Sequence, residues 1–132
     1  MIEGWHGNDY VVLFDATEAA ALSARYDIGK YLPGYTITGL LGWDDFIVKG
    51  DDGRYWTLPT MPCSADHIAP LKLDIDAGRV VADERFRGKL KWYTTPLVFG
   101  GSPADESNVI WVTLDQHVEL VKWWNDRYHK LR

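Results

Sequence analysis

A change in the spacing of apolar side chains at Tyr35 constrains the fold of this chain more than any other feature. Apolar and polar side chains alternate over 35–41 and again over 45–50, which is typical of strands with one buried face. The tetrapeptide Gly-Asp-Asp-Gly at 50–53 has the composition of a tight turn, and the alternation returns over 54–58. The sequence therefore predicts a meander of antiparallel strands in this region.

A helix is expected before the meander. The run Tyr-Val-Val-Leu-Phe at 10–14 predicts a buried strand that stops at Asp15. Asp15 can cap a helix, and Glu18 stands three residues later, which is the capping-box arrangement. The following residues are rich in alanine and other strong helix formers. We expect this helix to end between Tyr26 and Gly29, where Gly29 can adopt the left-handed conformation that closes helices.

The most regular helical pattern lies in the last 20 residues. The run Asn-Val-Ile-Trp-Val at 108–112 predicts a strand, and Thr113 with Gln116 forms a second capping box. From there, apolar side chains recur at spacings of three and four residues. These positions are Leu114, Val118, Val121, Trp124, Tyr128 and Leu131. The sequence therefore predicts a C-terminal amphipathic helix.

The stretch between the meander and the last strand is less regular. Three prolines in 59–70 predict irregular structure, apart from one helical turn that Ser64 can cap. The elements expected after it are a strand at 89–93, an extended piece at 97–99 and an acidic loop at 100–108. This order of elements predicts a single α+β domain over 1–132, with a mainly antiparallel sheet and helices packed on it.

Length and composition limit the class of protein. The apolar runs are far shorter than the roughly 20 residues that cross a bilayer, and the first ten residues do not resemble a secretion signal. We therefore expect a cytoplasmic protein without a membrane partner. The single cysteine, Cys63, cannot form an internal disulfide and has no zinc-binding pattern beside it. The four histidines are scattered, and we expect no metal and no cofactor.

The charge of the chain is negative and unevenly distributed. The formal net charge is −5. Residues 1–76 hold 12 acidic and 5 basic side chains, whereas residues 77–132 hold 7 acidic and 9 basic ones. An acidic surface repels phosphate backbones and attracts basic partners. Direct binding to nucleic acid is therefore not expected.

The acidic pairs lack the arrangement of catalytic carboxylates. Asp44 and Asp45 are adjacent, so that on a strand they point to opposite faces. Asp51 and Asp52 stand in the expected turn, where such side chains usually bond the local backbone. The sequence has no nucleophile elbow, phosphate-binding glycine loop or dinucleotide fingerprint. We expect a protein that is not an enzyme, with an enzyme of unknown type as a less favoured alternative.

Seven tryptophans are an unusual feature of a chain of 132 residues. Most of them are expected in the core, because burying large rings stabilises a small domain. Trp123 and Trp124 are about 100° apart on the expected helix, so they cannot both lie equally deep. Trp124 belongs to the apolar stripe, which leaves Trp123 at the core edge or on a contact surface. Trp43 lies at a strand end and is either a packing residue or an interface anchor.

The first half of the chain resembles the SUKH superfamily, whose bacterial members include immunity proteins against polymorphic toxins. The resemblance covers 3 to about 62 and rests on the order and spacing of several residues. The matching residues are Glu3, Gly4, Gly7, Tyr10, Leu13, Glu18, Tyr26, Tyr31, Leu32, Pro33, Gly34, Gly39, Gly42, Gly53 and Pro59. Family members usually carry one or two helices before this segment and a shorter ending. We therefore expect the C-terminal helix to cover the sheet where those helices would lie.

The resemblance implies a protein that binds a cognate toxin tightly and blocks it without catalysis. Acidic side chains would suit a basic toxin, such as a nuclease, by steering association. The residues expected to bind the partner are Trp43, Asp44, Asp45, Asp51 and Asp52, with Asp105, Glu106 and Trp123 as further candidates. The alternative is a module that binds a small ligand or glycan through exposed aromatic side chains, which requires a concave aromatic cleft.

Overall fold

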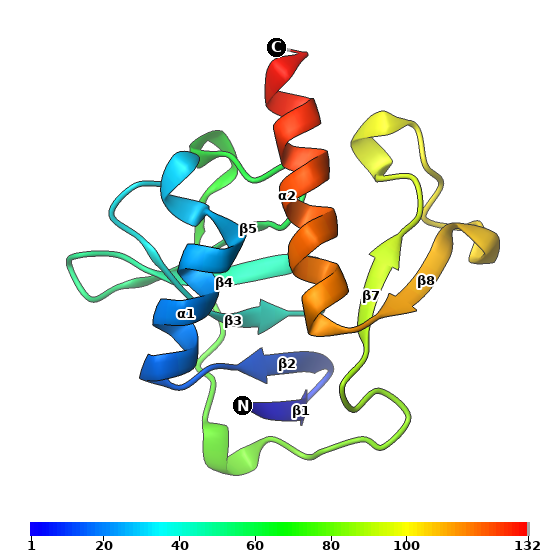
Figure 1. Cartoon of the computed structure of the whole chain (residues 1–132). Helices are drawn as coiled ribbons and strands as arrows, with labels where there is room; N and C mark the ends of the chain where they lie inside the picture. The colour runs from blue at the N-terminus through cyan, green and yellow to red at the C-terminus, as the bar shows by residue number, and fades with distance from the viewer. Residues whose placement is uncertain (132) are drawn as a thin grey trace.

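Six strands form an antiparallel sheet in the computed structural model of the chain, which describes residues 1–131 (Figure 1). Their order in the sheet is the order of the sequence. The strands are β1 (Ile2–His6), β2 (Asp9–Leu13), β3 (Thr36–Leu41), β4 (Asp45–Lys49), β5 (Tyr55–Pro59) and β6 (Ala69–Pro70). A second sheet pairs β7 (Leu90–Tyr93) with β8 (Val109–Val112), and the two α-helices are α1 (Ala16–Tyr26) and α2 (Leu114–Lys130). The predicted α+β class with a mainly antiparallel sheet is confirmed.

The predicted meander is the centre of the large sheet. β3 pairs with β4 and β4 with β5, both antiparallel, and all three inner residues of β4 are buried. The tight turn at 50–53 is present, because the Gly53 N–H donates to the Gly50 carbonyl at 3.0 Å. A shift in register beside Gly39 marks a β-bulge in β3. Local turn chemistry and alternation therefore sufficed to locate these strands.

The first helix begins as predicted and ends differently. The N–H of Glu18 donates to Asp15 Oδ1 at 2.8 Å, and the N–H of Asp15 donates to Glu18 Oε1 at 2.9 Å, which confirms the capping box. The left-handed residue that closes α1 is Asp27, at φ 59°, and not Gly29. The chain continues directly into a 3₁₀ turn, η1 (Ile28–Lys30), which buries Ile28 and leaves Gly29 within the turn.

The C-terminal helix is confirmed, but its buried face differs from the predicted stripe. The capping box of Thr113 and Gln116 is present. The buried residues of α2 are His117, Val118, Val121 and Asn125, whereas Leu131 is 68% exposed. Figure 1 shows that the last turns of α2 extend beyond the edge of the sheet, which explains why the C-terminal end of the predicted stripe is exposed. Two polar side chains thus lie in the core at positions that an apolar pattern cannot indicate.

Both helices lie on the same face of the large sheet, side by side (Figure 1). Tyr26 of α1 and His117 of α2 meet at 2.7 Å between the phenol oxygen and Nδ1. The ring of His117 also contacts Trp92 of β7 edge to face, at 5.6 Å between centroids. The helix α2 therefore joins the large sheet, α1 and the small sheet into one hydrophobic core.

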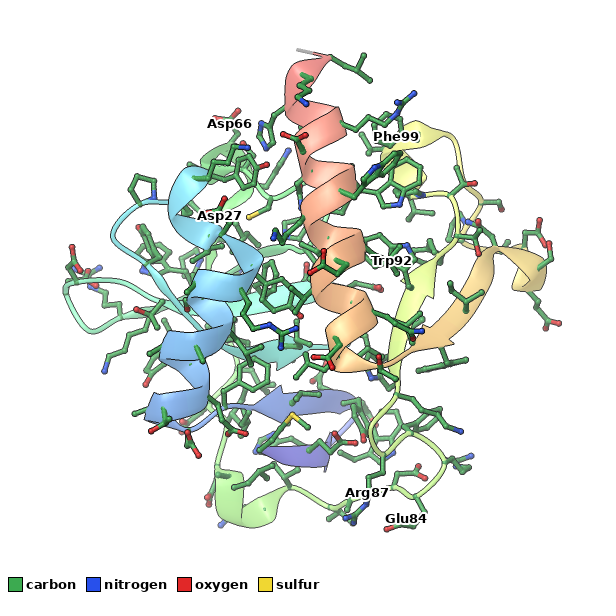
Figure 2. All side chains as sticks on the ribbon, in the orientation of Figure 1. Asp27, Asp66, Glu84, Arg87, Trp92 and Phe99 are labelled. Carbon is green, nitrogen blue, oxygen red and sulfur yellow. The ribbon has the colours of Figure 1, made fainter. Side chains whose placement is uncertain are left out.

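Two further segments differ from expectation. The strand β1 was not predicted; it pairs with β2, and Trp5 exchanges two backbone hydrogen bonds with Val81 along its outer edge. The piece at 97–99 is a 3₁₀ turn, η4 (Leu97–Phe99), and not extended, because Gly100 at φ 95° reverses the chain immediately after it. Figure 2 shows Phe99 of this turn beside α2, where its ring contacts Trp124 at 5.2 Å.

Burial of His117 predicts a loss of stability in mild acid. Desolvation lowers the pKa of His117 to about 4, against about 6.5 in an unfolded chain. Between these values the unfolded state binds more protons, so the free energy of unfolding decreases as the pH falls from 6.5 to 4. We expect a loss of about 3 kcal/mol from this group, measured by urea unfolding across that pH range.

The variant His117→Gln is the control for this prediction, because glutamine does not titrate and can still accept a hydrogen bond from Tyr26. The pH dependence of the variant should be flatter than that of the wild type over the same range. Equal slopes in both proteins would assign the acid sensitivity to other groups.

Candidate functional site

The acidic residues proposed from the sequence lie in three separate places. Asp44 ends the turn between β3 and β4 and Asp45 is the first residue of β4, whereas Asp51 and Asp52 belong to the turn between β4 and β5. These turns are at opposite ends of β4 and hence roughly 20 Å apart at about 3.4 Å per residue. Asp105 and Glu106 lie farther along the chain, at a 3₁₀ turn before β8. The acids therefore do not form a single face.

The acids of the second and third groups are exposed and mostly engaged with their own turns. Asp52 accepts a hydrogen bond from the Arg54 N–H at 3.0 Å and forms an ion pair with its side chain. Asp105 accepts two hydrogen bonds from Ser107, which lower the pKa of its carboxyl. This is the local backbone bonding that the sequence indicated for turn acids. Asp51 and Glu106 are exposed next to them.

Trp43 is a packing residue of an aromatic cluster. It has a left-handed backbone, at φ 63°, and its ring stacks on Tyr10 at 4.7 Å between centroids. Its edge contacts reach Trp5, Phe86 and Trp111 at 5.1 to 6.4 Å. Trp111 is 42% exposed and presents this cluster to solvent. The sequence hypothesis did not single out Trp111, which faces away from its buried neighbour Val112 on β8.

Trp123 is exposed, as one of the two sequence interpretations required. Its exposed fraction is 57%, and its ring contacts Trp124 edge to face at 4.9 Å. The guanidinium of Arg127 lies over the same ring, 5.7 Å from its centroid. With Tyr31, the residue after η1, Trp123 lines an open groove between α1 and α2. This groove and the cleft that contains Asp44 and Asp45 have no lining residue in common.

Asp44 and Asp45 line a cleft of about 360 Å³ between the two sheets, which we call the turn cleft. Three parts of the chain form its walls: the β3–β4 turn with the start of β4, the end of β5 with the residues after it, and β7 with η4. The lining residues are Asp44, Asp45, Pro59, Thr60, Met61, Pro62, Trp92, Tyr93, Pro96, Leu97 and Val98. Most of them are apolar or aromatic, and Leu97 and Val98 are exposed to solvent.

Two hydrogen bonds hold the walls of the turn cleft in place. The N–H of Thr60 donates to the Asp44 carbonyl at 2.9 Å, which joins the β3–β4 turn to the segment after β5. The amide of Asn125 on α2 donates to the Thr60 carbonyl at 2.8 Å. Figure 2 places Trp92, another wall residue, on β7 beside α2. The cleft is thus built on the core rather than on free loops.

The two carboxylates of the turn cleft differ in their pairing. Asp44 forms an ion pair with Lys91 at 2.8 Å, and Lys91 also donates to the Tyr93 hydroxyl. The carboxylate of Asp45 has neither a hydrogen bond nor an ion pair with any side chain or backbone group of residues 1–131. Burial and the neighbouring charge of Asp44 raise the pKa of Asp45. The three charged groups Asp44, Asp45 and Lys91 therefore leave one uncompensated negative charge.

The turn cleft offers groups for binding: one unpaired carboxylate, apolar walls and two aromatic rings. Within residues 1–131, no three His, Cys, Asp or Glu side chains lie close enough together to hold a metal ion. Of the four histidines, His117 is the buried one, and it contacts Tyr26 and Trp92 in the core. The thiol of Cys63 is also buried, which raises its pKa to about 12.

Comparisons with models of protein families, with curated proteins and with solved structures gave no match. In the described part of the chain, no helix is both long enough and apolar enough to cross a bilayer.

Proposed function

We propose that this chain is an immunity protein, which binds a protein toxin and neutralises it by stoichiometric contact without catalysis. The observation that carries this proposal is the unpaired carboxylate of Asp45 in the wall of an apolar cleft. A half-buried charge without a partner is unfavourable in the free protein, and a partner that supplies the opposite charge removes this penalty. Apolar pockets of this kind receive anchor side chains in protein interfaces.

The charge of the chain supports a basic partner. Residues 1–76, which hold the β3–β4 turn, contain 12 acidic against 5 basic side chains. A net negative charge favours association with a basic protein and disfavours acidic ones, even where the acids do not form a single face. A toxin that acts on nucleic acid carries a basic surface for its substrate. We therefore propose a basic toxin, such as a nuclease, as the partner, and a cytoplasmic location for the complex.

The proposal is tested by affinity capture followed by a growth assay. The tagged chain is incubated with lysate of the source organism at low and moderate salt, and the retained proteins are identified by mass spectrometry. A retained candidate is then expressed in a host with and without this chain. We expect growth arrest by the partner alone and normal growth when both proteins are present. A retained partner that does not arrest growth, or arrest that this chain does not relieve, would contradict the proposal.

Two double variants with equal charge changes test which end of β4 meets the partner. The first carries Asp44→Lys and Asp45→Lys in the turn cleft, and the second carries Asp51→Lys and Asp52→Lys at the other end. We expect the first to weaken partner binding by about a hundredfold, because it places like charges in the interface. The second should change mainly the association rate and its salt dependence. Equal losses in both variants would exclude the turn cleft as the contact.

Binding of a glycan is the second candidate function, favoured by the groove between α1 and α2. Tyr31 and Trp123 line this groove, and a concave aromatic surface is what that function requires. Titration of the chain with oligosaccharides should then change its tryptophan fluorescence, and Trp123→Ala should remove this change. An unchanged fluorescence of the wild-type chain would contradict glycan binding at this groove.

A further inference from the structure

The turn cleft has the features of a receptor for one basic side chain. Its walls combine the apolar residues Met61, Leu97 and Val98 with the acid Asp45. An arginine has the complementary arrangement, since an apolar stem carries a cationic head. A purely apolar side chain would fill the walls and leave Asp45 unpaired, at a cost in desolvation.

The local charge is consistent with a single cation. Asp44 is already paired with Lys91, whose ammonium lies over the Tyr93 ring at 4.8 Å from its centroid. Asp45 is the remaining charged group of this set. One entering cation therefore brings the sum of the charges at the cleft to zero, whereas a second one would meet the positive charge of Lys91.

The second wall group without a partner is the indole of Trp92. Trp92 is 5% exposed, and its Nε1 has no hydrogen-bond partner in residues 1–131. Buried indole N–H groups usually have an acceptor. This N–H is fully buried and lies out of reach of a ligand in the cleft, so Asp45 provides the polar recognition and the apolar walls provide the rest of the contact.

We propose that the turn cleft receives an arginine side chain of the partner protein, with its stem against Met61, Leu97 and Val98 and its guanidinium on the carboxylate of Asp45. This assignment rests on the proposed function, because it names the group by which the toxin is held. Arginine is favoured over lysine because a planar guanidinium can bond a carboxylate with two parallel N–H donors.

The proposal is tested with the isolated chain and two small probes. The ¹⁵N-labelled protein is titrated with N-acetylarginine amide, and in parallel with N-acetylcitrulline amide, which has nearly the same shape and no charge. We expect amide shifts that saturate with the arginine probe and are largest at Asp45, Leu97 and Val98. The citrulline probe should bind about tenfold or more weakly, since charge-assisted hydrogen bonds contribute more than neutral ones.

Two isosteric variants identify the carboxylate that is responsible. Asp45→Asn should abolish the preference for the arginine probe, whereas Asp52→Asn, at the other end of β4, should retain it. The spectra of both free variants show whether the fold is intact, and Asp45→Asn should be at least as stable as wild type because it removes an unpaired charge. Equal affinity for the two probes, no saturable binding of either one, or a preference that survives in Asp45→Asn would overturn the proposal.

The outcomes separate this inference from the proposed function. A captured toxin that binds wild type and Asp45→Asn with the same affinity would refute the arginine receptor and leave the immunity function in place. Binding of the arginine probe together with the absence of any neutralised toxin would support the receptor and refute the function.

Discussion

Replacement of Asn125 by alanine is expected to lower the free energy of unfolding by about 4 kcal/mol. Asn125 is 1% exposed, and its side chain makes three hydrogen bonds. Its Oδ1 accepts from the Cys63 N–H, and its Nδ2 donates to the carbonyls of Thr60 and Val121. Alanine would leave a buried N–H and a buried carbonyl of the segment after β5 without partners, at about 1 to 3 kcal/mol each.

The neighbouring variant Asp126→Asn is the control, since Asp126 forms only ion pairs with Lys30 and Lys130 at the surface. It should change stability by about 0.5 kcal/mol at most. Urea unfolding at neutral pH gives both values from the midpoint and slope. A loss below about 1 kcal/mol in Asn125→Ala would show that the hydrogen bonds of Asn125 do not hold the segment after β5.

Replacement of Gly39 by alanine is expected to destabilise the chain by about 3 kcal/mol or more. Gly39 is buried in β3, and a Cβ atom there would overlap the carbonyl oxygen of Val12 on β2. This oxygen is backbone and cannot rotate away, so β2 and β3 would have to separate. The two strands are paired over Val11, Val12 and Leu13, in the middle of the large sheet.

Gly29→Ala is the matched control for this variant. A Cβ atom at Gly29 meets no atom within 4 Å, and Gly29 does not have a positive φ. Since alanine restricts the unfolded chain, this variant should be as stable as wild type or more stable by up to about 1 kcal/mol. Both melting temperatures are measured by thermal unfolding. Equal melting temperatures of Gly39→Ala and Gly29→Ala would contradict a steric overlap at Gly39.

Elements with local signals were predictable from the sequence. The capping boxes at Asp15 and Thr113 fixed the starts of both helices, and the Gly-Asp-Asp-Gly turn fixed the pairing of β4 with β5. Each of these signals involves residues fewer than six positions apart. The strand β1 carries a local signal that the prediction missed, because the two-residue turn Gly7-Asn8 joins it to β2. The turn η4 carries no comparable signal, since it packs against the distant helix α2.

The candidate site was predictable only in part. Asp44 and Asp45 were predicted as partner-binding residues because they are adjacent acids after a glycine turn, and both line the turn cleft. The same reasoning grouped them with Asp51 and Asp52, which the length of β4 holds apart. The apolar wall from Leu97 and Val98 is more than 50 residues away in sequence and reaches the site only through the packing of the small sheet.

The most direct test of stoichiometric neutralisation is a titration of the captured toxin's activity against increasing amounts of this chain. We expect that the toxin's activity falls linearly and reaches zero at a fixed ratio of the two proteins, independent of incubation time. Complete loss of activity over time with a small fraction of this ratio would indicate turnover and therefore an enzyme. Full activity in the presence of a large excess of the chain would show that the bound protein is not neutralised.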